Sequence, residues 1–318
     1  MRRFALVNIV WILVVITLGA LTRLLDAGLG CPDWPVCYGQ IIPSFNEQAQ
    51  NFSAWEFDSL KAWMEMIHRY AASLLGLSMI VQAILLFPRY LGAARWLAVF
   101  LVVWVVIQGL FGMWTVTWRL WPPVVSAHLL GGAVTLGAQF LIWRTLTSNR
   151  EPKWFGPWMA FALVVFIQMG LGAWTSSQYA GLACPDFPTC QGRWWVEMDA
   201  SIFSAPMVDG DEYLGGMLGM QQRMGIQWLH RLGAIVVLAM FAYLMWKQQA
   251  QRRALMFASV FLVMQIALGI LNAILLLPLS LALLHNTVAM LLWMAALNGS
   301  TAEQEEYEDD NVPEELLA

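Results

Sequence analysis

Long apolar runs alternate with short polar segments along most of this chain. Each run is about 20 residues long, the length that an α-helix needs to cross the apolar core of a bilayer. Inside a bilayer, a helix satisfies all of its backbone polar groups internally, whereas a loop does not. The pattern predicts eight membrane-spanning helices, at Phe4–Leu24, Trp63–Phe87, Trp96–Thr117, Val124–Trp143, Trp158–Trp174, Ile226–Met245, Leu255–Leu276 and Leu281–Leu297.

The composition agrees with this pattern. Of 318 residues, 59% are hydrophobic and 12% are charged, and the mean hydropathy is +0.61. A soluble globular domain does not carry so much apolar surface, so soluble enzyme classes are excluded. The first run follows Met1–Arg3, exceeds the apolar region of a typical signal peptide, and precedes no small-residue cleavage site. We expect it to be retained as a membrane span.

The basic residues predict the orientation of the eight spans. Most of them fall on one side of the arrangement, and cytoplasmic loops carry an excess of lysine and arginine. We therefore expect a protein of the bacterial inner (cytoplasmic) membrane with both termini in the cytoplasm. The basic residues on this side are Arg2, Arg3, Arg89, Arg95, Arg144, Arg150, Lys153, Lys247, Arg252 and Arg253.

A twelve-residue stretch occurs twice and holds all four cysteines. The first box, GLGCPDWPVCYG, covers Gly28–Gly39; the second box, GLACPDFPTCQG, covers Gly181–Gly192 and is identical to the first at eight positions. Both fall in long loops on the predicted periplasmic side, which is oxidising. The spacing predicts two short disulfide-closed turns, Cys31–Cys37 and Cys184–Cys190. A structural staple is the favoured interpretation, and a redox-active pair is the alternative.

The repeat extends beyond the boxes. At the same separation of 153 residues, Gly19 and Thr22 match Gly172 and Thr175. We predict two tandem four-helix bundles, inserted the same way up because each has an even number of spans and related by a pseudo-two-fold axis along the membrane normal. The predicted divisions are an N-terminal half (1–148), a C-terminal half (149–300) and an acidic cytoplasmic tail (301–318), which supplies most of the net charge of -4.

The four histidines of the chain occupy equivalent places in the two halves. His68 and His128 belong to the first half, and His230 and His285 to the second. Each lies roughly six residues inside the outer end of its predicted helix, a shared depth of about 9 Å. Alternate helices of a four-helix bundle lie diagonally opposite, so the two histidines of each half are predicted to face each other.

Two facing imidazoles suit the axial positions of a haem iron. A zinc site is the competing interpretation, but zinc takes three or four protein ligands and each half supplies two histidines. Taken alone, a histidine is also explained as a buried polar group bonded to a neighbour. Arginines at this depth are candidate partners of haem propionates, or side chains that simply reach the membrane surface. They are Arg23, Arg69, Arg119, Arg223 and Arg231.

One polar position distinguishes the halves. Glu65 lies three residues before His68, on the same helix face, whereas Gln227 lies three residues before His230. A carboxylate beside a buried porphyrin can accept or hold a proton, and an amide cannot. The alternative is that Glu65 only pairs with an arginine at the membrane surface.

This combination resembles the haem A synthase family. The resemblance rests on the pairs His68-Arg69 and His230-Arg231, on CPDWPVC and CPDFPTC within the boxes, and on Glu65. It covers nearly all of the first 300 residues and leaves out the acidic tail. It implies an all-α membrane oxidoreductase that converts haem O to haem A for cytochrome oxidases, oxidising one ring methyl to a formyl group through a hydroxymethyl intermediate.

The resemblance also implies a division of labour. The N-terminal half would bind haem O between His68 and His128, with Glu65 as the catalytic residue, and the C-terminal half would hold haem B between His230 and His285 as an electron-transfer cofactor. The implied partners are haem O and the lipid bilayer. Haem O synthase and an electron donor, a quinol or a redox protein, are open candidates. Oligomerisation is left open, and no nucleic acid is expected.

Two functions from other classes compete. A quinone-linked periplasmic thiol oxidase would use the cysteine pairs as active groups, but it leaves the histidines unexplained. A bis-haem electron-transfer cytochrome, or a haem-binding transporter, would use the histidines without altering the haem. The difference between Glu65 and Gln227 argues against this function, because a symmetric electron path does not require the two halves to differ at this position.

Two histidines would fill both axial positions of the substrate iron and leave none for oxygen. The source of the oxygen atom therefore stays open.

Overall fold

The computed structural model describes residues 1–44, 57–90, 92–148, 156–208, 212–248 and 251–301. Eight helices within these ranges are long and apolar enough to cross a membrane, so the chain is an all-helical, multi-pass membrane protein, as predicted. Residues 149–155 at the start of the predicted C-terminal half and 302–318 of the acidic tail lie outside the description. The helices are α1 (Arg2–Leu24), α3 (Ser59–Leu86), α4 (Ala93–Thr117), α5 (Pro122–Ser148), α6 (Pro157–Ser177), the short 3-10 helix η1 (Ala200–Phe203), α7 (Met220–Lys247), α8 (Arg252–Ile274) and α9 (Leu279–Ser300).

Helix α3 begins earlier than the apolar pattern predicts, at Ser59 instead of Trp63. The cause is a polar cap, because the Asp58 carboxylate accepts a hydrogen bond of 3.1 Å from the Lys61 amide. With 28 residues, α3 is about 42 Å long and exceeds the apolar core of about 30 Å. Its outer turns therefore extend beyond the apolar core.

The position of two histidines along their helices also differs from the prediction, because their helices begin before the apolar run. Helix α7 also has 28 residues and begins at Met220, not at Ile226. His68 and His230 consequently lie nine and ten residues after the first residue of their helices, instead of about six. Polar residues continue both helices outward past the apolar run.

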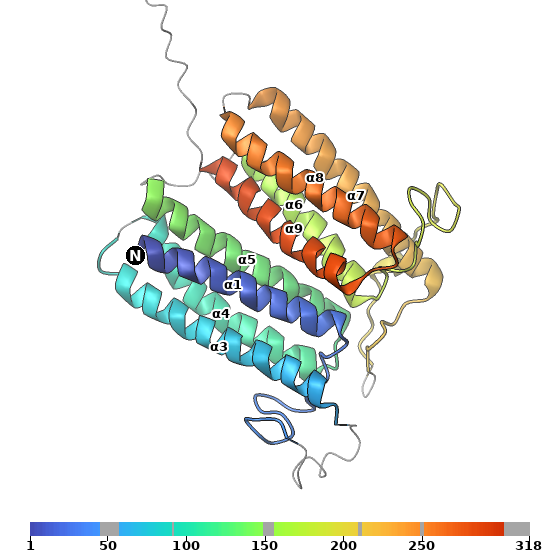
Figure 1. Ribbon diagram of the computed structural model, residues 1–318, viewed down its shortest axis with the longest axis horizontal. Helices are drawn as coiled ribbons and strands as arrows, with labels where there is room; N and C mark the ends of the chain where they lie inside the picture. Colours follow the sequence, from blue (N-terminus) through green and yellow to red (C-terminus); the bar gives the residue numbers. More distant parts are fainter. Residues whose placement is uncertain (45–56, 91, 149–155, 209–211, 249–250, 302–318) are drawn as a thin grey trace, which may run out of the picture.

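Helices of each half pack mainly on one another (Figure 1). Helices α3 and α5 each contact both α1 and α4, and helices α7 and α9 each contact both α6 and α8. Between the halves, α5 contacts α6 and α9, while α1 contacts α9. In each half, the two histidine-bearing helices therefore lie opposite each other, on either side of the centre of that half. They are α3 and α5 in the first half and α7 and α9 in the second.

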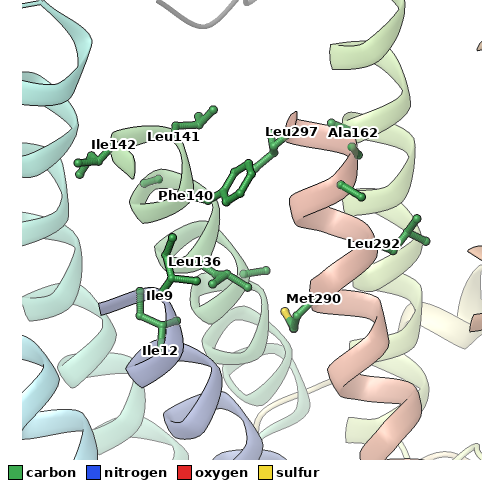
Figure 2. Close-up of a cluster of buried hydrophobic side chains, with 14 of the residues drawn as sticks. Ile9, Ile12, Leu136, Phe140, Leu141, Ile142, Ala162, Met290, Leu292 and Leu297 are labelled. Carbon is green, nitrogen blue, oxygen red and sulfur yellow. The ribbon is translucent and has the colours of Figure 1, made fainter. Parts of the chain in front are cut away.

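Apolar side chains of α1, α5, α6 and α9 fill the space between the two halves (Figure 2). Phe140 of α5 extends toward Leu297 of α9, and Leu136 lies near Ile9 and Ile12 of α1. All five of these side chains are buried. The described parts of both box-bearing loops lie at one end of the helices, and the N-terminus lies at the other (Figure 1).

A buried amide cluster links three helices near the N-terminal end of α1. The Asn8 amide donates to Gln82 Oε1 (2.7 Å), the Gln82 amide donates to Gln139 Oε1 (2.9 Å), and Ser78 Oγ donates to Asn8 Oδ1 (2.7 Å). The three amide side chains are at most 1% exposed. Because buried polar groups are costly unless they are bonded, this cluster fixes the relative positions of α1, α3 and α5.

Candidate functional site

The first histidine pair meets across the middle of the N-terminal helices. His68 of α3 and His128 of α5 have ring centres 6.4 Å apart, with planes at 87°. Two metal–imidazole bonds of about 2 Å each put the bonded nitrogens about 4 Å apart and the ring centres about 6 Å apart. The observed separation therefore fits two axial ligands of one iron.

The ring nitrogens and their surroundings also fit such a group. The Nδ1 atoms of His68, His128 and His285 are buried and have no hydrogen-bond partner in the described part of the protein. His230 and His285 lie close enough for electrostatic interaction. Across the ranges described, no three residues among His, Cys, Asp and Glu gather as ligands of a metal ion. Histidine pairs without a third ligand suit a haem better than zinc.

Glycines on a neighbouring helix give every histidine its space. A Cβ atom added to Gly19 would lie 2.9 Å from His68 Cε1, and one added to Gly172 would lie 3.2 Å from the Cε1 atom of His230. Gly112 and Gly269 face the histidines of α5 and α9 in the same way, at 3.4 and 3.2 Å. Both glycine pairs occupy matching positions in the two halves, so the close approach of ring to helix is a repeated feature.

Glu65 is buried and bound on both carboxylate oxygens. Its Oε2 accepts the Cys31 amide N–H at 2.9 Å, and its Oε1 pairs with the Arg69 guanidinium. The side chain therefore ties α3 to the first box, and the pairing with an arginine that the sequence raised as the alternative is present. In the second half, Gln227 Oε1 is buried without a partner among the described residues. The two halves thus differ in structure, as well as in sequence, at this position.

The arginines next to the first histidine of each half hold the boxes. Arg69 Nη1 donates to the carbonyls of Asp33 (3.0 Å) and Val36 (2.7 Å). Arg231 donates to the carbonyls of Asp186 (2.8 Å) and Thr189 (2.6 Å), which are the matching positions of the second box. Each box is therefore bound to the residue that follows a candidate ligand. A contact of these arginines with a propionate stays a prediction.

The other three candidate arginines lie elsewhere on the same end of the molecule. Arg23 donates to the Ser176 carbonyl, and its guanidinium lies 3.8 Å from the centre of the Tyr179 ring, so it joins α1 to the end of α6. Arg223 donates to the Leu218 and Gly215 carbonyls, both at 2.7 Å. The Arg119 carbonyl accepts the Tyr213 amide at 3.0 Å. These contacts connect helices and loops, and their propionate role is likewise a prediction.

Both boxes fold alike. Disulfides join Cys31 to Cys37 and Cys184 to Cys190, as predicted. Each box contains a cis X-Pro bond, Trp34-Pro35 or Phe187-Pro188.

Each box is also closed by one aspartate. Asp33 accepts the amides of Tyr38 and Gly39, and Asp186 accepts those of Gln191 and Gly192. The second box has one bond more, from the Thr189 hydroxyl to Asp186. Partial burial opposes ionisation, but hydrogen bonds from Thr189, Gly192 and Gln191 outweigh it and lower the pKa of Asp186 to about 2.

Comparison with known proteins agrees with this arrangement. The model of the family described as "Cytochrome oxidase assembly protein" matches residues 2–297. A haem A synthase of Shewanella oneidensis is 39% identical over 90% of this chain and 91% of its own length. This chain belongs to the haem A synthase family. More distant haem A synthases are those of Shouchella clausii, 25% identical over 74% of this chain and 72% of the relative, and Halalkalibacterium halodurans, 22% identical over 77% and 76%.

Sequence reasoning about this haem A synthase family member missed one kind of contact and one residue. It did not anticipate that Arg69 and Arg231 bind the box carbonyls, because that contact needs each loop to fold back along its helix. It also missed Gln168, whose amide lies 3.2 Å from His230 Nδ1. A signal for Gln168 was present, since it is a polar residue within an apolar run.

Proposed function

We propose that this protein is a haem A synthase, an oxidoreductase that converts one ring methyl of haem O to a formyl group through a hydroxymethyl intermediate. The observation that carries the proposal is a pair of matching histidine sites of which only one has a carboxylate beside it. Family membership and the printed names of the relatives support it. Two similar sites with one acid–base group suit one reacting haem and one that only carries electrons.

In this proposal, His68 and His128 hold haem O as the substrate, and His230 and His285 hold haem B. Haem B, when bound, supplies one-electron transfer. The ring spacing of the first pair supports these assignments, as do the buried Nδ1 atoms of His68, His128 and His285, which have no partner among the described residues. The apolar helices around each pair would exclude water from a bound haem, and the glycines opposite the histidines let the rings lie close to their neighbouring helix.

In this proposal, Glu65 is the acid–base group beside the reacting methyl, where it takes up or relays protons whichever way the oxygen atom arrives. It stands three residues before His68, and its carboxylate is held by Arg69 and the Cys31 amide. Proton uptake at Glu65 weakens its ion pair with Arg69, while the arginine keeps its bonds to the box carbonyls. The box therefore stays closed over the outer end of the site during the reaction.

The proposal places the chain in the bacterial inner membrane, with both termini in the cytoplasm and both boxes in the periplasm. The lysine and arginine distribution supports this orientation. We further infer that residues 1–148 and 149–300 are repeats related by a pseudo-two-fold axis along the membrane normal. Matching contacts support it, because α5 meets α6 and α9 meets α1 at the centre.

The deciding experiment is haem identification. The protein is purified in detergent from cells that supply haem O, its absorption spectrum is recorded, and the extracted haems are identified by mass. Haem B together with haem O, its hydroxymethyl form or haem A is the expected result. Haem B alone would favour an electron-transfer cytochrome. A protein without haem would overturn the proposal and favour the thiol oxidase.

A further inference from the structure

The second histidine site has a polar group that the first site lacks. Gln168 of α6 points its amide nitrogen at His230, 3.2 Å from Nδ1 and 2.9 Å from the backbone carbonyl. The Oε1 atom of the same side chain is buried and has no partner among the described residues. An unsatisfied acceptor thus lies on the residue that touches the ring.

Space for Gln168 comes from a glycine. A Cβ atom at Gly233 of α7 would overlap Gln168 Oε1. In the first half, Val15 occupies the position that matches Gln168, 153 residues earlier, and Ala71 occupies the position that matches Gly233, 162 residues earlier. These separations are those of the boxes and of His68 and His230 respectively. The second half thus has a polar side chain and an open position where the first half has two apolar side chains.

This difference in polar groups affects how the histidine that binds the iron is held. A histidine that binds a metal through Nε2 carries its proton on Nδ1, and a partner that accepts this proton orients the ring and strengthens the metal bond. Turning the terminal amide of Gln168 over by half a turn exchanges its two atoms, so that Oε1 meets His230 Nδ1 and the present amide bond to the His230 carbonyl is given up. The Val15 side chain offers no such acceptor to His68, and the acceptor beside that ring is the Val15 backbone.

We propose that Gln168 is a positioning residue that makes His230 a permanent haem ligand, and that Val15 leaves His68 able to release its haem. This inference rests on the proposed function, in which the first site must discharge a product after each turnover and the second must retain its cofactor. The pairs Gln168 with Gly233 and Val15 with Ala71 thus separate a resident site from an exchange site.

The test compares Gln168→Met with the unchanged protein. Methionine keeps the length and approximate volume of glutamine but removes the acceptor, so packing against Gly233 is retained. Each protein is loaded with haem B, and its transfer to excess apomyoglobin is followed by absorption. We expect transfer to be faster by about 10- to 100-fold in the variant, with little change in thermal unfolding. The g-values of the oxidised haem by low-temperature electron paramagnetic resonance should also change, since they report ring orientation.

The converse change is Val15→Gln with Ala71→Gly, which copies the second site into the first. Haem O bound at the first site should then leave more slowly, by about 10-fold or more. Because this variant is expected to gain retention, a merely damaged fold cannot imitate the result.

The outcomes separate the two proposals. If the unchanged protein holds no haem B, the proposed function fails. If it holds haem B, but Gln168→Met releases it at the unchanged rate with unchanged g-values, the role of Gln168 is overturned and the proposed function stands. Failure of Gln168→Met to fold leaves the converse variant to decide, and faster or equal release of haem O there would also overturn the inference.

Discussion

The two halves of this protein share a frame and differ in a few polar side chains. Each has a histidine pair, glycines opposite the rings, a disulfide box and an arginine that binds the box. They differ at two matching positions. Glu65 and Val15 of the first half correspond to Gln227 and Gln168 of the second half. In the proposed function, the comparison teaches that the repeated scaffold builds a place for a haem, while neighbouring polar groups decide what happens to it.

The halves also differ away from the histidines. The buried amides Asn8, Gln82 and Gln139 join three helices of the first half. The matching positions of the second half hold Phe161, Leu244 and Ala296, all fully buried. At these positions, hydrogen bonds join the helices of the first half, whereas apolar packing joins the helices of the second half.

Removing a histidine ligand should have the largest effect on haem binding at one site and not at the other. We expect His230→Ala to remove haem B from the second site and abolish activity, while haem O still binds at the first. His68→Ala should do the reverse, leaving haem B in place. Extraction and mass identification of the haems from each variant checks this. Loss of both haems in both variants, with normal thermal unfolding, would contradict the independence of the two sites.

Removing the one carboxylate should be the next largest effect. Glu65→Gln makes the first site match the second at this position and keeps an acceptor for the Cys31 amide. Because general acid–base groups contribute about 100- to 10,000-fold, product formation should fall in this range with haem binding retained. The measurement is haem A yield per bound haem. Gln227→Glu is the matched control and should keep most activity. Full activity of Glu65→Gln would rule out its acid–base role.

Filling the space opposite a ring should have a moderate effect. Gly19→Ala would place a Cβ atom 2.9 Å from His68, and Gly172→Ala one 3.2 Å from His230. Both changes favour the helix itself by about 0.5–1 kcal/mol, so any loss must come from the displaced ring. We expect haem affinity to fall several-fold, more at the first site than at the second. Haem titration of the two variants checks the order, and equal affinities would refute it.

The smallest expected effect concerns acid sensitivity of the boxes. The pKa of Asp186 in the folded loop is about 2, below its ordinary 3.8. Its contribution to loop stability is therefore complete above about pH 4 and is lost as the pH falls toward 2. Thr189→Val, which copies Val36 of the first box, should shift this loss to higher pH. The rate at which a phosphine reduces Cys184–Cys190 between pH 5 and 2 measures it. An unchanged pH profile would count against the Thr189 bond.

Much of the fold was predictable because the bilayer imposes a simple rule on sequence. Runs of about 20 apolar residues gave the eight spans, and the spacing of Cys31 and Cys37 gave their disulfide. Helix ends were predicted less well, since the cap at Asp58 lies outside the apolar run.

The contacts of Glu65 and Arg69 with the first box depend on how a loop folds back on a helix. No local pattern encodes that path. By contrast, the facing of His68 and His128 followed from the diagonal geometry of a four-helix bundle, and the structure has the two rings face to edge across its middle.

The contacts between the halves have a consequence for how two unlike sites can coexist. The α5–α6 contact has its counterpart in α9–α1, and α5 meets α9 between them. This is the pattern of an isologous interface, by which one four-helix unit could pair with a second copy of itself. In such a homodimer every substitution would appear at both sites at once. Joining the copies in one polypeptide makes their association independent of concentration, and it allows Glu65 to stand at one site and Gln227 at the other.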